Sequence, residues 1–77
     1  MKETFLTVAA KVLGVAPETL SDASSPESVP TWDSLNGLLL VSELEKSFDV
    51  TFTMDEILAV ERLGDFRALL AARGKDV

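Results

Sequence analysis

Apolar residues recur at three- and four-residue steps in three stretches of the chain, a spacing that predicts three main helices. We place these helices at Lys2 to about Leu13, Ser34 to about Phe48, and Leu63 to Arg73. A shorter helix to about Val60 should begin at Thr53-Met54-Asp55-Glu56, because a threonine and a glutamate three residues apart can satisfy each other's free backbone N–H groups. The fold class is therefore all-α: a small helical bundle of three main helices plus one short helix, with no sheet.

The helix ends and the core follow from the same pattern. Gly14 and Gly74 are predicted to end the first and last helices, since glycine readily takes the left-handed conformation found after a helix. The last helix has Arg62 where a capping serine or threonine would help, so its start is predicted to fray. One core should collect inward-facing residues from all four helices: Phe5, Val12, Leu40, Leu44, Phe48, Ile57, Phe66 and Leu69.

Residues 15–33 form a connection that is unusually long for a small domain, and such connections are commonly functional or cross over between helices. Pro17 can start one turn of helix through Leu20. The remainder is rich in serine, proline and aspartate, which favour turns and loops. Trp32, the only tryptophan, is predicted to anchor the end of this loop on the core.

The helix that starts at Ser34 has more apolar residues than one buried face can use. At about 100° per residue, its core side holds Gly37, Leu40, Val41, Leu44 and Phe48, with Leu38 at the border. Its other side holds Leu35, Leu39 and Ser42, beside Lys46. A helix needs only the first group to pack on a core, so we interpret the second group as a surface for a partner. The alternative, that Leu39 covers a neighbouring helix or the long loop, stays open.

Composition narrows the possible functions. At 77 residues, with 47% hydrophobic and 26% charged residues, the chain is predicted to be a single globular domain. A net charge of −6 argues against a nucleic-acid partner, because binding phosphates needs a basic surface. The lack of cysteine and histidine removes disulfides, zinc sites and any Ser-His or Cys-His nucleophile pair, and we expect no metal site. No apolar run is long enough to cross a membrane, and we expect a monomer in the cytoplasm without a membrane partner.

Ser34 stands at a helix start between an acid and a leucine. A serine hydroxyl needs a base to become a nucleophile, and the chain has no histidine. Lys46 lies roughly three turns further along the same helix, out of reach. We therefore expect no catalytic residues and no enzyme activity. The simplest interpretation is that Asp33 or Ser34 only caps the helix, but it leaves the second apolar face and the long loop unexplained.

Asp33-Ser34-Leu35 at the start of a helix resembles the attachment motif of the acyl carrier protein family. The resemblance extends over nearly the whole chain: to the long loop from Asp22 to Trp32, to the helix and its end from Leu40 to Val50, and to Leu63-Gly64-Asp65-Phe66 at the start of the last helix. It implies that residues 1–77 form one acyl-carrier-like domain, with the family's order of helices.

The resemblance also implies a cofactor and its chemistry. A phosphopantetheinyl transferase would move phosphopantetheine from coenzyme A onto Ser34, which would be a substrate rather than a catalyst. The thiol of the arm would carry acyl groups as thioesters between enzymes, as a discrete acyl carrier protein in fatty acid, other lipid, polyketide or related biosynthesis. Its partners would be the transferase, an acyl- or aminoacyl-loading ligase or transferase, and downstream acyl-using enzymes.

Together with the second apolar face, the resemblance gives six candidate docking residues around Ser34: Asp33, Leu35, Leu38, Leu39, Ser42 and Glu45. Family members often carry acids along the exposed face of this helix, whereas Asn36, Gly37 and Leu39 stand at its early positions here. We therefore expect a dedicated set of partners rather than a housekeeping role in fatty acid synthesis. Two alternatives remain: an aminoacyl or peptidyl carrier, and an unmodified helical interaction module that binds through its exposed leucines.

Overall fold

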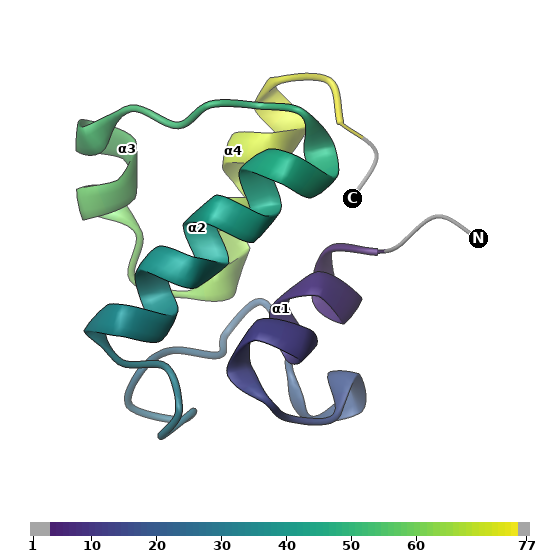
Figure 1. Ribbon diagram of the computed structural model, residues 1–77, viewed down its shortest axis with the longest axis vertical. Helices are drawn as coiled ribbons and strands as arrows, with labels where there is room; N and C mark the ends of the chain where they lie inside the picture. Colours follow the sequence, from purple (N-terminus) through teal and green to yellow (C-terminus); the bar gives the residue numbers. More distant parts are fainter. Residues whose placement is uncertain (1–3, 76–77) are drawn as a thin grey trace.

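The computed structural model describes residues 4–75, which form a bundle of four α-helices joined by loops (Figure 1). The helices are α1 (Phe5–Leu13), α2 (Ser34–Phe48), α3 (Met54–Ala59) and α4 (Leu63–Ala72), with one 3₁₀ turn, η1 (Pro17–Thr19), in the first loop. No strand occurs within these residues, so the all-α prediction is confirmed. None of the helices described has the length and apolarity that crossing a membrane requires.

The helix boundaries follow the capping signals. Thr4 caps α1, because its hydroxyl accepts the N–H of Thr7 at 3.2 Å; the predicted start at Lys2 lies outside the described residues. Gly14 ends α1 and Gly74 follows α4 with φ values of 68° and 76°, in the left-handed region that favours glycine. The predicted bounds of α2 are confirmed, and α4 ends one residue before its predicted end at Arg73.

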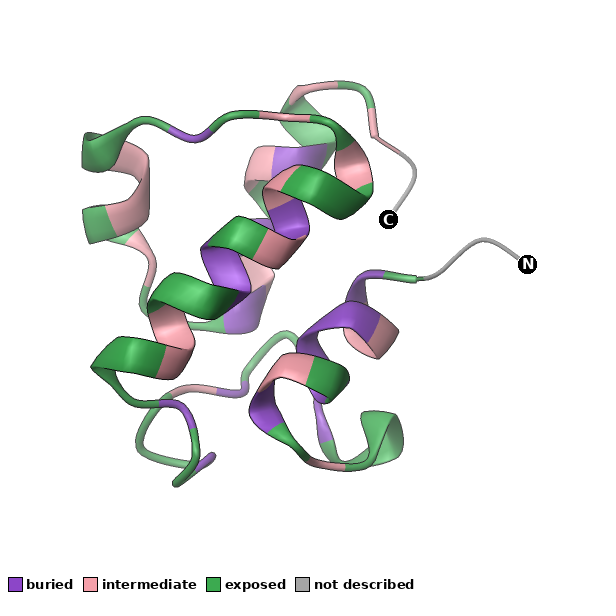
Figure 2. Cartoon of the chain, viewed as in Figure 1, coloured by how far each residue is buried: buried purple, intermediate pink, exposed green. Residues whose placement is uncertain are grey.

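The core lies where α2 meets α1 and α4, and Figure 2 shows the buried positions on the sides of these helices that face inward. Phe5, Leu40, Leu44 and Phe66 are buried as predicted. Four further predicted residues pack against this core but are only partly buried: Val12, Phe48, Ile57 and Leu69. A domain this small has so much surface for its volume that the edge of each helix's apolar face stays partly in contact with water.

Several buried residues lie outside the predicted core. Leu20, Val29 and Trp32 of the first loop are buried, which confirms that Trp32 anchors the end of that loop. Phe52 lies in the loop between α2 and α3, and its ring packs on Phe66 with 5.8 Å between ring centroids. The loops therefore complete a core that the helices alone leave open.

The start of α4 is bonded to the first loop. The backbone N–H groups of Leu63 and Gly64 donate to the carbonyl oxygens of Ser24 and Asp22, each at 2.9 Å. A Cβ atom at position 64 would lie 3.0 Å from both the Cβ and the carbonyl oxygen of Asp22, so this close approach requires glycine. The Arg67 guanidinium adds an ion pair to Asp22 at 2.7 Å.

The prediction that this helix start frays needs correction. Arg62 supplies no capping acceptor, but the Asp65 carboxylate accepts the N–H groups of Glu61 and Arg62 at 2.8 and 3.1 Å. These two hydrogen bonds hold the pKa of Asp65 below its ordinary value. Together with the bonds to the first loop, they give the N–H groups around the helix start the acceptors that a capping side chain would have given.

The predicted capping box at the start of α3 is confirmed. The Thr53 hydroxyl accepts the N–H of Glu56 at 3.1 Å, and the Glu56 carboxylate accepts the N–H of Thr53 at 2.9 Å. The same carboxylate oxygen binds the Arg73 guanidinium at 2.5 Å. That guanidinium also donates to the carbonyl oxygen of Thr51 and lies over the ring of Phe52. The end of α4, the start of α3 and the loop between α2 and α3 are thus joined at Arg73.

Candidate functional site

Ser34 is the first residue of α2, and Asp33 before it caps the helix. The Asp33 carboxylate accepts the N–H of Asn36 at 2.9 Å, and the Asp33 carbonyl oxygen accepts the N–H of Gly37 at 2.8 Å. The Ser34 side chain is exposed, and among residues 4–75 its hydroxyl has no hydrogen-bond partner. Capping therefore falls to Asp33 and leaves the Ser34 hydroxyl available for chemistry.

The loop before Ser34 is fixed at its last residues. The Thr31 hydroxyl donates to the carbonyl oxygen of Leu13 at 2.6 Å, and the side-chain amide of Asn36 donates to the carbonyl oxygen of Thr31 at 2.6 Å. These two bonds connect the end of α1 to the first turn of α2. The position of Ser34 is therefore set by the packing of two helices rather than by a loose loop.

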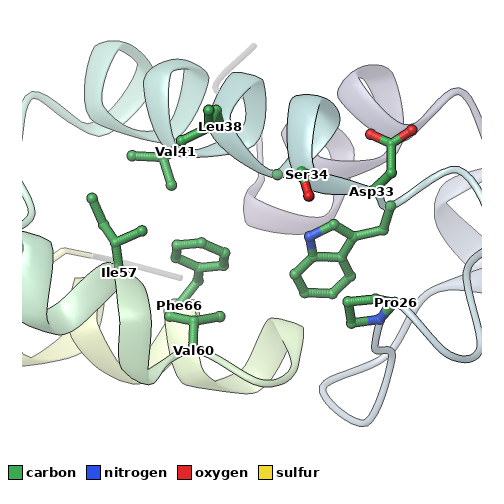
Figure 3. A pocket seen from close by; sticks show the side chains of 10 residues that line it. Pro26, Asp33, Ser34, Leu38, Val41, Ile57, Val60 and Phe66 are labelled. Atoms are coloured by element: carbon green, nitrogen blue, oxygen red, sulfur yellow. The ribbon is translucent and has the colours of Figure 1, made fainter.

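A pocket of about 330 Å³ opens beside Ser34, between α2, α3, the start of α4 and the first loop. Its wall is mostly apolar: Pro26, Trp32, Asp33, Ser34, Gly37, Leu38, Val41, Ile57, Val60 and Phe66. Figure 3 shows the Ser34 hydroxyl directed from α2 toward this pocket, whereas the Asp33 carboxylate points away from it. An apolar group attached through Ser34 can therefore lie against the pocket wall without meeting the Asp33 charge.

The first turn of α2 fits a negatively charged group on Ser34. Within the described chain, the backbone N–H groups of Ser34 and Leu35 have no acceptor. The N-terminus of a helix carries a partial positive charge and open N–H donors, which favour a phosphate there. A phosphodiester on the Ser34 hydroxyl would lie next to both donors. The residues present are therefore compatible with a phosphate-linked cofactor.

The structure places the leucines of the second apolar face at the surface. The exposed fractions are 67% for Leu35, 62% for Leu38 and 48% for Leu39, so Leu39 is not a core residue. Leu38 borders the pocket beside Ser34, whereas Leu39 lines a different groove between α1 and α2 together with Val8 and Val12. Leu38 and Leu39 thus border two different hollows beside α2, and Leu35 is exposed at the start of the helix.

The remaining candidate docking residues separate into two kinds. Ser42 is exposed on α2, as predicted. Glu45 is half-buried, and its carboxylate accepts the N–H of Phe52 at 2.8 Å, which fastens the loop that follows α2. Glu45 therefore has a structural contact that the sequence did not indicate, and its docking role stays a prediction.

Sequence reasoning missed three features near the site. Trp32 and Gly37 form part of the pocket wall, and Met54 and Leu58 are exposed on α3. The signal for the exposure of Leu58 was present, since a helix that turns Ile57 and Val60 inward leaves the positions between them outside. Met54 had no such signal, because it precedes Ile57 by three residues and helical spacing places both on one face. The approach of Trp32 to Gly37 had no such local signal, because it depends on the path of the long loop.

A small helical bundle with a free serine at a helix N-terminus, beside an apolar pocket, has the features of a carrier domain. A family model described as "Phosphopantetheine attachment site" matches residues 3–70, and the chain belongs to this family. Its cofactor is covalently attached phosphopantetheine. Carrier domains of this family are not catalytic themselves, and they interact with phosphopantetheinyl transferases and acyl-handling enzymes. A search of curated proteins found no match.

Proposed function

We propose that Ser34 is the attachment site and that the chain is an acyl carrier for fatty acid, other lipid, polyketide or related biosynthesis in the cytoplasm. This proposal rests on the different roles of Asp33 and Ser34 at the start of α2. Asp33 supplies the cap, so the Ser34 hydroxyl is exposed and has no partner within residues 4–75. Ser42, another exposed serine of α2, does not line this pocket.

Each part of the site has a role in this function. The bound arm supplies a thiol, which this chain lacks, for thioester formation with the cargo. The open N–H groups of Ser34 and Leu35 would hold the phosphodiester, as helix N-termini hold phosphates elsewhere. The apolar wall formed by Leu38, Val41 and Phe66 would exclude water from an acyl chain that folds back along it.

Partners would dock around Ser34 through the exposed leucines. Leu35 and Leu38 are the most exposed, and burying such side chains against a partner provides affinity. Leu39, Ser42 and Glu45 would extend this contact along α2, and Asp33 would meet the phosphopantetheinyl transferase. Charged residues at the rim would mainly tune the association rate. We expect the same surface to receive the transferase, the loading enzyme and the acyl-using enzymes in turn.

The apolar pocket favours an acyl cargo over an aminoacyl or peptidyl one. An aminoacyl group carries an ammonium, and moving that charge against an apolar wall without a partner is costly. The pocket wall includes one charged side chain, Asp33, and its carboxylate points away from the pocket (Figure 3). An unmodified interaction module has no need of a serine hydroxyl left free by its neighbour.

Intact-mass measurement after incubation with coenzyme A and a broad-specificity transferase tests the attachment site. The unaltered chain should gain the mass of one phosphopantetheine arm. Ser34→Ala should gain nothing, and Ser47→Ala, a matched change at an exposed serine of α2 outside the proposed docking residues, should be modified normally. If Ser34→Ala still gains the arm, the site is wrong. Supplying the holo-protein with acyl- and aminoacyl-loading enzymes then decides between the two kinds of cargo.

A further inference from the structure

The side chain of Trp32 is an unusual part of the pocket wall, because it is buried while its indole N–H donates no hydrogen bond within residues 4–75. Only 7% of the residue is exposed, and its backbone N–H donates to the carbonyl oxygen of Val29 at 2.9 Å. Within residues 4–75, the indole Nε1–H has no acceptor. Every fully buried side-chain N or O atom in that part of the chain has a partner, so the indole nitrogen is not fully buried, and Trp32 lines the pocket beside Ser34.

Gly37 is the reason that this N–H stays uncovered. A Cβ atom at position 37 would lie 3.3 Å from Nε1 and 3.7 Å from Cδ1 of Trp32. Glycine is among the poorest helix formers, yet it stands here as the fourth residue of a 15-residue helix. Gly37 follows Ser34 by three residues, which puts it on the same side of α2. Because Gly37 has no side chain, the edge of the Trp32 indole that is nearest to the Ser34 side of α2 is not covered.

We propose that the indole N–H of Trp32 is a third donor to the phosphodiester of the arm on Ser34, together with the backbone N–H groups of Ser34 and Leu35. This inference rests on the proposed attachment at Ser34. A hydrogen bond to an ionised phosphate oxygen is stronger than one to a neutral acceptor, and the partly desolvated position of the indole strengthens it further. Trp32 is then a positioning residue: it holds the first atoms of the arm against the pocket wall, so that the rest of the arm starts along the pocket instead of into solvent.

Nuclear magnetic resonance tests this directly, because the single tryptophan gives a single indole N–H signal. The signal is compared in ¹⁵N-labelled apo- and holo-protein, after intact mass has shown that conversion is complete. On attachment, the indole N–H signal should shift, and its exchange with water should slow about tenfold or more, as expected for a hydrogen bond to a charged group. Ser34→Ala incubated with coenzyme A and transferase is the control, and its indole signal should stay where it is.

A second measurement removes the N–H without removing the ring. Trp32 is replaced by its benzothiophene analogue, which has sulfur in place of the indole N–H, and the ³¹P signal of the holo-protein is recorded. The phosphorus resonance should move relative to that of the unaltered holo-protein. Gly37→Ala provides an independent variant, because its methyl group would cover Nε1 and should reduce the indole shift caused by attachment while the helix is retained.

The outcomes separate this inference from the proposed function. If no arm is added to Ser34, the proposed function fails and this inference fails with it. If mass confirms the arm but the indole signal and its exchange do not change, only the role of Trp32 is overturned, and the residue is simply a hydrophobic anchor. The indole signal could move on attachment while the ³¹P signal is the same with and without the indole N–H. That result would also overturn the assignment of the phosphodiester as the acceptor.

Discussion

The polar groups at the two ends of α2 differ in whether they have hydrogen-bond partners. At the N-terminal end, the hydroxyl of Ser34, the backbone N–H groups of Ser34 and Leu35 and the indole N–H of Trp32 have no partner within the described chain. At the C-terminal end, the Glu45 carboxylate accepts the N–H of Phe52, and Arg73 joins Glu56, Thr51 and the Phe52 ring.

This difference supports the proposal that the N-terminal end binds the arm. Folded proteins leave few buried polar groups without hydrogen-bond partners, so the unpartnered indole N–H of the buried Trp32 indicates a site for another molecule. At the C-terminal end, Glu45 and the nearby Arg73 hold the loop after α2 through their polar groups. The substitutions below test this contrast.

The largest effect should come from the core that both ends share. Leu44 is fully buried, and Leu44→Ala should lower the free energy of unfolding by about 2–5 kcal/mol, because it leaves a cavity under α2. Leu38→Ala is the matched control on the same helix, and it should change stability little because that leucine is exposed. Urea unfolding followed by circular dichroism measures both. Equal losses in the two variants would contradict the assignment of the two faces of α2.

Removing the cap at the N-terminal end should have the next largest effect. Asp33→Ala should cost about 0.5–2 kcal/mol of unfolding free energy, because the N–H of Asn36 loses its acceptor. Asp33→Ser, which keeps an acceptor for the same N–H, should recover most of this loss. Ser34→Ala should leave stability nearly unchanged, since Asp33 is the cap. A loss in Ser34→Ala as large as that in Asp33→Ala would show that the serine also caps the helix.

Breaking the C-terminal end should affect stability and leave attachment intact. Arg73→Ala removes the contact over the Phe52 ring, which alone contributes about 0.5–1 kcal/mol at an accessible position, and it also removes the ion pair to Glu56. Thermal unfolding should show a lower melting temperature, whereas the rate of phosphopantetheine transfer to the folded protein should stay the same. A transfer rate that falls in parallel with stability would mean that the two ends of α2 are coupled.

Acid should weaken the C-terminal end of α2 through Glu56 and the start of α4 through Asp65. The hydrogen bond from Arg73 and then the backbone N–H of Thr53 hold the pKa of Glu56 below its ordinary 4.5, and two backbone N–H groups hold the pKa of Asp65 below its ordinary 3.8. A lowered pKa in the folded state contributes stability above these ordinary values, and the contribution is lost as pH falls through the lowered pKa values. Urea midpoints measured from pH 7 to pH 3 should therefore drop below about pH 4.5. Glu56→Gln and Asp65→Asn should each flatten this dependence, and an unaltered slope would contradict the assignment.

The smallest effect on stability should come from Leu39→Glu, at about 0.2–0.5 kcal/mol, since the new carboxylate lies one turn from Glu43 on the helix surface. Its effect should fall on partners instead. Transfer by a cognate enzyme should weaken at an unchanged melting temperature, because a charge replaces an apolar contact. A large drop in melting temperature would show that Leu39 stabilises the groove between α1 and α2 more than its exposure suggests.

The sequence was informative wherever the interaction is local. Asp33 and Asn36 are three residues apart, as are Thr53 and Glu56, so the starts of α2 and α3 could be predicted from spacing alone. The resemblance around Ser34 identified the family before any geometry was known. The exposure of Leu39 was left open, because helical spacing gives its direction but not the distance to the neighbouring helix.

What could not be predicted depends on the paths of the loops. Phe52 is a core residue because the loop after α2 turns back over α4, and Glu45 is fixed by that same loop. Asp65 replaces the missing cap at Arg62 because its carboxylate turns back onto the chain before α4. No periodicity encodes such contacts, since each one depends on where a segment without regular structure comes to lie.

The glycine where α4 meets the first loop has a consequence for redesign. Because Asp22 passes so close to Gly64, a larger residue at position 64 would press on the carbonyl oxygen and the Cβ atom of Asp22, neither of which is the end of a flexible side chain. An engineer who wants the carrier to accept other enzymes can therefore vary the loop after Ser24, but has to keep the stretch from Asp22 to Ser24 and this glycine as one unit. In a library that randomises residues 22–30 and position 64 together, the folded members should retain glycine at 64 and differ mainly after residue 24.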